Sequence, residues 1–154
     1  MQIRPAKVSD VKEIHKLVEY YADKKEMLHR SLNSIYENIQ EYIVAEEDGK
    51  IIGCGALHVA WEDLAEVKAL AIAQEHQGKK IGSKIVAQLQ ENAKELGVKK
   101  VFSLSFKPEF FQKLGYSIIP KEMLPHKIWS ECINCHLFPD CGEVPLLLSL
   151  DKND

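Results

Sequence analysis

Apolar residues recur along the N-terminal third of the chain at intervals of three and four positions. This is the period of a helix that buries one face. The pattern predicts a first helix that opens near Asp10, with Glu13 placed as the partner residue of a capping box. A second helix is predicted to begin at the cap residue Ser34. The apolar positions of the first helix are Val11, Ile14, Leu17, Val18 and Tyr21, and those of the second are Ile35, Ile39 and Tyr42.

The pattern changes to that of strands from Tyr42 onward. Residues 42–46 and 50–59 are rich in strand-forming types and are joined by Glu47-Asp48-Gly49. An Asp-Gly pair between two such runs is typical of a hairpin. In a first, short strand Pro5 lacks an N–H, so we expect that strand at a sheet edge or ending at this residue. The strands predicted besides the hairpin are 3–6, 66–72, 101–105, 116–119 and 144–150.

A long amphipathic helix is predicted to follow the loop at 77–82 and to end at Gly97. A short helix at 108–114, closed by Gly115, comes later in the chain. Helices and strands alternate without an internal repeat or a linker, which predicts one α+β domain over residues 1–154 with a mixed sheet. The apolar face of the long helix is formed by Ile81, Ile85, Val86, Leu89, Ala93 and Leu96.

Composition and charge exclude several functional classes. The chain has 154 residues, enough for one compact domain, and a formal net charge of −3. Nucleic acid calls for clustered Lys and Arg, so we expect no nucleic-acid partner. No apolar run approaches the ~20 residues that span a bilayer, and the N-terminus lacks the layout of a secretory signal. We therefore expect a cytoplasmic protein without a membrane partner.

Lysines surround the start of the long helix. Helix N-termini favour Asp or Glu, yet this one carries Lys79, Lys80 and Lys84. Gly78 and Gly82 would let the backbone approach a bound anion closely. One interpretation is a site for a phosphate-bearing ligand, and the other is a solvated helix start whose lysines bind nothing. Neither the P-loop pattern nor the dinucleotide Gly-x-Gly-x-x-Gly pattern is present.

Three segments carry a resemblance to a known family. Residues 66–72 (EVKALAI) and 77–82 (QGKKIG) resemble the central strand and pyrophosphate loop of the GNAT N-acetyltransferases, whose loop reads Arg/Gln-x-x-Gly-x-Gly/Ala. Residues 110–116 (FFQKLGY) resemble a later helix-to-strand segment of the same family. Lys80 stands where the family usually has its middle glycine, so we expect this position to adopt a conformation that a side chain tolerates.

The resemblance implies a mostly antiparallel mixed sheet flanked by helices, in three layers α-β-α. It also implies acetyl-CoA as the cosubstrate and an acyltransferase activity. The residues expected at acetyl-CoA are Leu70, Ala71 and Ile72 through strand-edge hydrogen bonds, Gln77, Gly78, Lys79, Lys80, Ile81, Gly82 and Ser83 around the pyrophosphate, and Phe111 at a position where many members have tyrosine.

Acetyl transfer to an amine requires a base, and a carboxylate whose pKa lies near the working pH can serve. The resemblance places Glu66 where several family members have a catalytic glutamate. The alternative for Glu66 is an ion pair with Lys68, its neighbour on the same face of the strand. The general acid is unassigned, because a phenylalanine at position 111 cannot donate a proton. The candidates are His58, Cys132 and water, and the alternative is that the thiolate leaves unassisted.

A closer resemblance, which runs to about residue 127, is to the acetyltransferase domain of N-acetylglutamate synthases. It implies glutamate as the acceptor and a role in arginine biosynthesis. A dicarboxylate calls for fixed cations, and Arg30, Lys107 and Lys127 occupy matching positions. The segments that carry this resemblance are 28–31, 57–66, 104–107 and 124–127.

Two alternatives to this function stay open. One is acetylation of another amine, such as a polyamine, an aminoglycoside antibiotic or a protein N-terminus. The other is a non-catalytic acyl-CoA-binding sensor. Homodimers are common for this fold, so a second copy of the chain is an expected partner by analogy.

Three cysteines lie in a loop at about 126–142. Cys132, Cys135 and Cys141 form Cys-x2-Cys-x5-Cys, whose first half is a typical half-site for zinc. His126 or His136 would supply a fourth ligand. The alternative is three free thiols, because a cytosolic location disfavours a disulfide framework.

Overall fold

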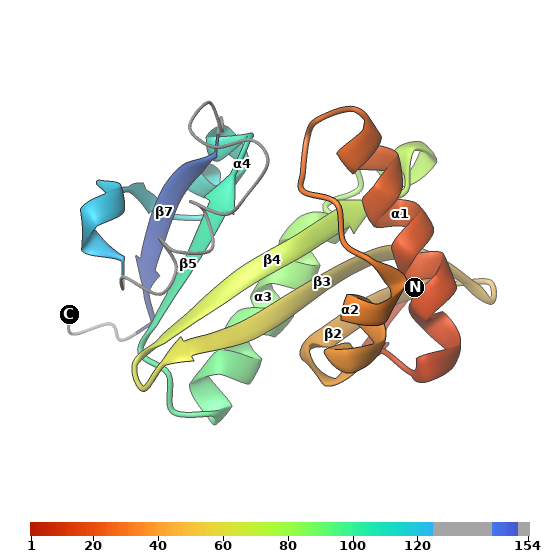
Figure 1. The fold of residues 1–154 in the computed structure, drawn as a ribbon, viewed down its shortest axis with the longest axis horizontal. Helices are drawn as coiled ribbons and strands as arrows, with labels where there is room; N and C mark the ends of the chain where they lie inside the picture. The colour runs from red at the N-terminus through yellow and green to blue at the C-terminus, as the bar shows by residue number, and fades with distance from the viewer. Residues whose placement is uncertain (125–142, 151–154) are drawn as a thin grey trace.

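The computed structural model describes residues 1–124 and 143–150. Within these ranges the chain forms a seven-stranded sheet (Figure 1). Its strands are β1 (Gln2–Pro5), β2 (Tyr42–Glu47), β3 (Lys50–Trp61), β4 (Leu64–Ile72), β5 (Lys100–Ser105), β6 (Ser117–Ile118) and β7 (Val144–Ser149). Their order in the sheet is β1-β2-β3-β4-β5-β7-β6, and only β4 and β5 run parallel to each other. The predicted mixed and mostly antiparallel sheet is confirmed, with the Pro5 strand at its edge.

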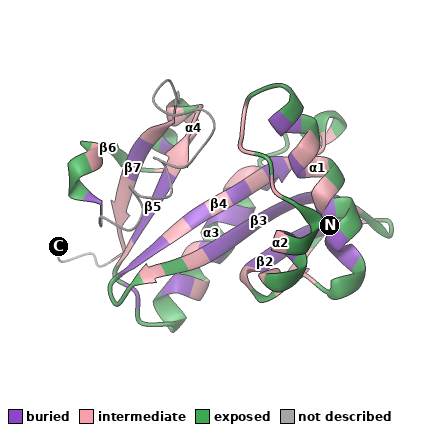
Figure 2. Cartoon of the chain, viewed as in Figure 1, coloured by how far each residue is buried: buried purple, intermediate pink, exposed green. Residues whose placement is uncertain are grey.

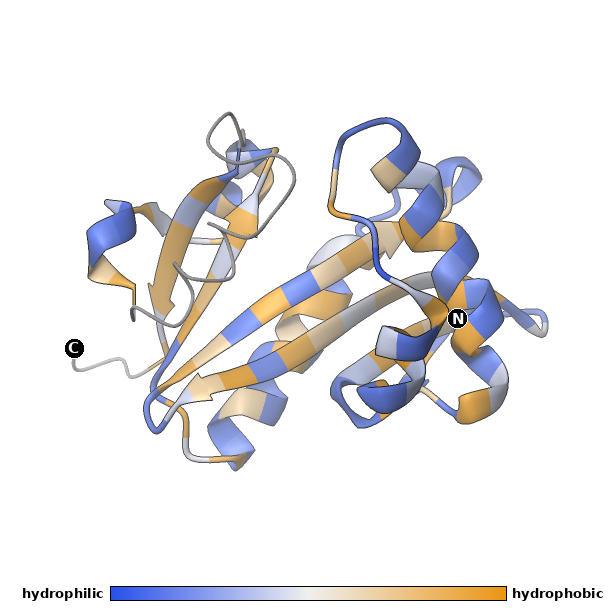
Figure 3. Cartoon of the chain, viewed as in Figure 1, coloured by the Kyte–Doolittle hydropathy of each residue, from blue (hydrophilic) through white to orange (hydrophobic). Residues whose placement is uncertain are grey.

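Helices cover both faces of this sheet. They are α1 (Val11–Asp23), α2 (Leu32–Glu37), α3 (Ile81–Glu95) and α4 (Pro108–Lys113). α1 and α2 share one core with β2, β3 and β4, whereas α3 and α4 belong to a second core on the opposite face. Figure 2 shows buried residues along β3 and β4 between these layers, and Figure 3 shows hydrophobic and hydrophilic positions alternating around the helices. None of the described helices combines the length and the apolar character needed to cross a membrane.

The predicted hairpin and the predicted long helix are confirmed. Asp48 and Gly49 connect β2 to β3 with φ angles of 52° and 77°, the left-handed values that a tight two-residue hairpin needs. α3 buries every predicted apolar position except Leu96, and Gly97 follows with a φ of 87°. The prediction for Leu96 is wrong: the residue is 64% exposed, because α3 ends at Glu95.

The predicted capping box of α1 is also wrong. Asp10 stands at the N-cap of α1 but makes no side-chain cap there. Its carboxylate instead accepts hydrogen bonds from the Lys7 backbone N–H at 2.7 Å and from the Arg4 guanidinium at 2.8 and 3.1 Å. The Glu13 carboxylate accepts from the backbone N–H of Ile51 at 3.2 Å and so ties α1 to β3. Contacts outside the helix therefore occupy both carboxylates.

α2 begins earlier than predicted. The Ser31 hydroxyl accepts from the Ser34 N–H at 3.0 Å, so Ser31 rather than Ser34 is the N-cap. The 3-10 turn η2 (Ile39–Glu41) follows the helix, and Tyr42 opens β2. The apolar spacing suggested one longer helix because the side chains of η2 and β2 pack into the same core as Ile35.

β4 leaves β5 partway along its length. The parallel ladder between them covers only residues 64–66 of β4 and 100–102 of β5. On the opposite edge of β4 a bulge interrupts the pairing with β3 between Cys54 and Ala56, and Ala69 adopts a φ of 56°. From residue 67 onward, β4 therefore offers on its β5 side backbone N–H and C=O groups that no strand of the described residues pairs.

Candidate active site

A cavity of about 760 Å³ lies where β4 leaves β5. Residues 66–72 of β4 and 103–107 at the end of β5 contribute to its walls. Further lining comes from the start of α3, from α4, and from residues 26–30 between α1 and α2. Segments predicted to bind the cofactor and segments predicted to bind the acceptor thus meet in one cavity.

Nearly all residues predicted at the cofactor line this cavity. They are Leu70, Ala71, Ile72, Gln77, Gly78, Lys80, Ile81, Gly82, Ser83 and Phe111. Lys79 is not among the lining residues, and its ammonium lies 3.3 Å from Nδ1 of His76. Phe111 is 5% exposed and packs edge-on against Phe110 and Tyr116, so most of its ring belongs to the core.

The loop before α3 has the geometry of an anion site. Lys80 is the N-cap of α3, at a φ of 64°, and its side chain makes no capping hydrogen bond. The first backbone N–H groups of a helix have no acceptor within the helix. In α3 these groups include those of Gly82 and Ser83, and both residues line the cavity. Gly82 also permits close packing, since a Cβ there would lie 3.3 Å from Cζ of Phe110. Gly78 has a φ of 84°, which favours glycine.

Tyr21 holds this loop against the end of β4. Its hydroxyl donates to the backbone carbonyl of Ile72 and accepts from the side-chain amide of Gln77. Burial raises the pKa of Tyr21, so the phenol keeps its proton for this contact. The sequence indicated only a core position for Tyr21, because its partners lie more than fifty residues away along the chain.

Glu66 lines the cavity with a half-buried side chain. Burial raises the pKa of its carboxyl group, while the positive charges of Lys68 and Arg30 act in the opposite direction. A carboxylate with a raised pKa is a stronger base, suited to removing a proton from an ammonium group. The two interpretations of Glu66, as a base and as a charge partner of Lys68, are therefore compatible. The positive charge of Lys68 limits how far burial raises the pKa of Glu66.

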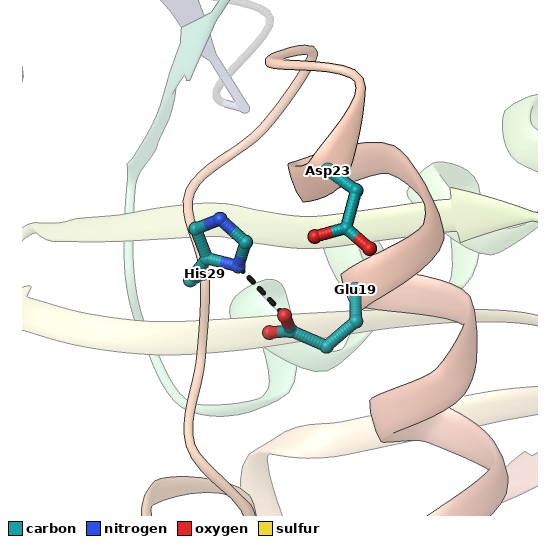
Figure 4. Close-up of side chains that lie close together, drawn as sticks. All are labelled: Glu19, Asp23 and His29. Carbon is teal, nitrogen blue, oxygen red and sulfur yellow. Dashed lines mark hydrogen bonds and ion pairs between the residues drawn. The ribbon is translucent and has the colours of Figure 1, made fainter.

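Arg30 also lines the cavity, and its charge reaches Glu66. Its Nε is buried and has no hydrogen-bond partner among the described residues. Glu19 of α1 positions this segment, because one carboxylate oxygen accepts from the Arg30 backbone N–H at 3.2 Å and the other lies 2.6 Å from Nδ1 of His29. Figure 4 shows the Glu19–His29 contact, with Asp23 beside it on the next turn of α1.

The other predicted acceptor residues and the cysteines have different outcomes. Lys107 lines the cavity, but its side chain is 65% exposed and its ammonium lies 3.3 Å from the Glu26 carboxylate. Lys127 and the predicted zinc ligands Cys132, Cys135 and Cys141 lie outside the described residues. Their roles stay predictions.

The candidates for the general acid that lie within the described residues are held away from the cavity. His58 does not line the cavity, and its Nδ1 lies 2.6 Å from the Glu41 carboxylate. Tyr116, whose ring packs against Phe111, is 3% exposed and donates to Oε1 of Gln90 at 2.8 Å. Burial raises its pKa, so this proton is bound firmly in the core. Cys132 lies outside the described ranges.

Proteins of known sequence resemble the chain over almost its full length. An uncharacterized N-acetyltransferase of Chlorobaculum tepidum is 36% identical over 148 residues, which cover 96% of each chain. An amino-acid acetyltransferase of Mycobacterium tuberculosis is 39% identical over 132 residues, covering 84% of this chain and 75% of the relative.

Two solved structures share the fold. A Mycobacterium tuberculosis protein in complex with CoA and NLQ superposes with a TM-score of 0.85 and 34% identity, covering 97% of this chain and 99% of that one. An N-acetylglutamate synthase of Neisseria gonorrhoeae, complexed with coenzyme A and N-acetyl-glutamate, gives a TM-score of 0.90 at 25% identity. The match covers 98% of this chain but only 35% of the synthase.

The predicted fold and enzyme class are confirmed by a further match. The family model of the acetyltransferase (GNAT) domain matches residues 38–118, which span β2 to β6 and include Glu66, the loop before α3 and α4. Together with the relatives above, this match shows that the chain belongs to the GNAT family of acetyltransferases.

Proposed function

We propose that this enzyme transfers the acetyl group of acetyl-CoA to the amino group of an amino acid, and that glutamate is the acceptor. The product would be N-acetylglutamate, an intermediate of arginine biosynthesis. The observation that carries the proposal is the pairing of Glu66 with Arg30 in one cavity. This cavity places a carboxyl group that can act as base and a guanidinium that can bind a carboxylate beside the predicted cofactor loop.

Acetyl-CoA supplies the activated acetyl group when it is bound. The unpaired side of β4 beyond Glu66 offers backbone N–H and C=O groups to an extended amide chain, at Leu70, Ala71 and Ile72. The uncapped first turn of α3 offers amides and a positive dipole end to phosphates, and Lys80 adds a charge. Both relatives described above as solved structures contain CoA.

The acceptor arrives as an ammonium and must lose a proton before its nitrogen can attack the thioester. In our proposal Glu66 removes that proton, directly or through one water. Arg30 lines the same cavity, and its guanidinium binds a carboxylate of the acceptor. An amino-acid acetyltransferase among the relatives, and the synthase structure that holds N-acetyl-glutamate, support an amino-acid acceptor.

The direct test measures thiol release from acetyl-CoA with a panel of amino acids, polyamines and aminoglycosides. We expect saturable turnover with glutamate. Glu66→Gln should reduce kcat/KM by about 10²–10⁴-fold, the usual range for loss of a general base. Arg30→Gln should raise KM for glutamate about tenfold or more and leave KM for acetyl-CoA unchanged, because it removes a charged hydrogen bond to the acceptor alone.

Glu62→Gln is the matched control, since Glu62 is exposed at the turn between β3 and β4. It should behave as the unmodified enzyme. Turnover with a polyamine or an aminoglycoside but not with glutamate would refute the acceptor assignment and leave the enzyme class intact. Binding of acetyl-CoA without turnover of any amine would favour the sensor.

A further inference from the structure

Glu41 and His58 form a contact that the proposed reaction does not yet use. Nδ1 of His58, on β3, lies 2.6 Å from Oε2 of Glu41, the last residue of η2. The other oxygen of this carboxylate, Oε1, is buried and has no hydrogen-bond partner among the described residues. Within the described residues, the imidazole ring is therefore the hydrogen-bond partner of the Glu41 carboxylate. A carboxylate on Nδ1 fixes the tautomer with the proton on that nitrogen, which leaves the lone pair on Nε2.

His58 stands beside Glu66. The two residues are direct partners in the antiparallel β3–β4 ladder, so their side chains project from the same face. Directly opposed residues have Cβ atoms about 4.5–5.5 Å apart. The His58 side chain is 37% exposed, whereas Glu66 is half-buried in the cavity wall. The imidazole thus borders both the carboxylate and solvent.

The reaction releases one proton for each acetyl group transferred. The acceptor ammonium loses a first proton, which Glu66 takes as an N–H bond breaks and an O–H bond forms. The nitrogen loses a second proton as the amide forms, and the departing CoA thiolate takes it up to become the thiol. The first proton must leave Glu66 before the next cycle, and the raised pKa of this carboxyl group slows that loss to water.

We propose that His58, oriented by Glu41, is the relay that carries this proton from Glu66 to solvent. The proposal rests on the proposed role of Glu66 as the base. In the relay, Nε2 of His58 accepts the Glu66 proton, directly or through one water, while Glu41 stabilises the positive charge that forms on the ring. The ring then loses the proton to solvent, and Glu66 is again a carboxylate.

The other charged groups near Glu66 cannot fill this role. Lys68 on β4 and Arg30 before α2 carry positive charge and have no lone pair to accept a proton at neutral pH. Glu143, ahead of β7, acts on Glu66 as a like charge. On the β5 side, the residue paired with Glu66 is the apolar Phe102. Among the described groups that act on Glu66, the imidazole alone has a ring nitrogen that can hold either a lone pair or a proton.

The test compares His58→Asn and Glu41→Gln with the unmodified enzyme at low buffer concentration. The Asn amide keeps a hydrogen-bond donor near the Nδ1 position for Glu41 but has no basic nitrogen. We expect kcat to fall about tenfold or more, with KM for acetyl-CoA unchanged. Added imidazole should restore kcat in a concentration-dependent way, because a free base can replace the missing carrier. Glu41→Gln should give a smaller loss that imidazole also restores.

Two results would overturn the relay. One is an unchanged kcat and pH profile in His58→Asn at low buffer. The other is a loss of kcat that imidazole does not restore although the variant melts at the same temperature as the unmodified enzyme, which would indicate a structural role. These assays use the fastest acceptor of the amine panel, so a wrong glutamate assignment changes only the substrate employed. Full activity of Glu66→Gln would instead show that Glu66 is not the base, and the relay proposal would then be wrong as well.

Discussion

Glu66 shows how one side chain combines opposing influences. Its place in the cavity wall removes water from the carboxyl group, which raises the pKa, while Lys68 and Arg30 favour the charged form. Because burial is the largest of these causes, the folded protein holds the Glu66 proton more tightly than the unfolded chain does. Catalytic groups often carry such an energetic cost, which the rest of the fold offsets.

This balance predicts how stability depends on pH. Below the ordinary glutamate pKa of 4.5 the carboxyl is protonated in both states, so Glu66 has no pH-linked cost. As pH rises above that value the folded state loses stability relative to the unfolded chain. Glu66→Gln should therefore melt at a higher temperature than the unmodified protein at pH 7, and the gain should vanish near pH 4. Calorimetry at both pH values measures it. A variant less stable at pH 7 would contradict this prediction, and Glu62→Gln should show no such trend.

At the scale of the element, the backbone conformation at the start of α3 bears on the proposed binding of acetyl-CoA. The helix has no side-chain cap, and its N-cap residue Lys80 is left-handed. The left-handed backbone conformation destabilises a residue that has a Cβ by about 1–2 kcal/mol, and glycine avoids this cost. The resemblance to GNAT loops led us to expect a conformation that a side chain tolerates, and the structure shows one that it adopts only at this cost. We propose that the lysine is kept at this position because its charge contacts the phosphates of acetyl-CoA.

Replacing Lys80 separates these two effects. Lys80→Gly should stabilise the protein by about 1 kcal/mol, because glycine adopts the left-handed conformation freely. It should also weaken acetyl-CoA binding about fivefold through loss of one exposed charge contact. Lys80→Ala should weaken binding equally without the gain in stability. Chemical denaturation and calorimetric titration measure the two quantities. Unchanged affinity in both variants would show that the lysine does not contact the cofactor.

The whole molecule is organised around the separation of β4 from β5. The sheet is continuous at one end of these strands, where residues 64–66 pair with 100–102, and open at the other, where the cavity lies. The bulge at Ala69 changes which side chains of β4 face each core, so Ala69 and Ala71 pack on the α1 side while Ile72 packs on the α3 side. The fold thereby leaves the polar backbone of β4 available to a ligand.

Binding of CoA should protect this part of β4. We expect the backbone amides of residues 67–72 to exchange with deuterium at least tenfold more slowly in saturating CoA, while those of β1 and β2 change little. The melting temperature should rise as well, since a ligand at 100 times its Kd stabilises the folded state by about 2.7 kcal/mol. Dephospho-CoA, which keeps the pantetheine, should give the same protection in β4. Protection restricted to the loop before α3 would exclude the strand-edge contact.

Local features of this protein could be predicted from its sequence. The hairpin at Asp48-Gly49, the buried face of α3 and its end before Gly97 depend on residues a few positions apart, and the sequence contains those residues in order. The cavity residues of β4 and of the loop before α3 were identified through the family resemblance, which runs along consecutive positions.

Contacts between distant segments were decided by the tertiary structure alone. Glu13 was predicted as part of a capping box, but folding brings the backbone N–H of Ile51 on β3 to its carboxylate. Nothing in the sequence pairs Glu41 with His58, or Tyr21 with Gln77, because a side chain's partner depends on which strands and helices become neighbours. The sequence by itself thus determined the elements, their order and the family, since periodicity and turn chemistry act over a few residues. The tertiary structure decided which charges share the cavity, since burial and charge interactions act through space.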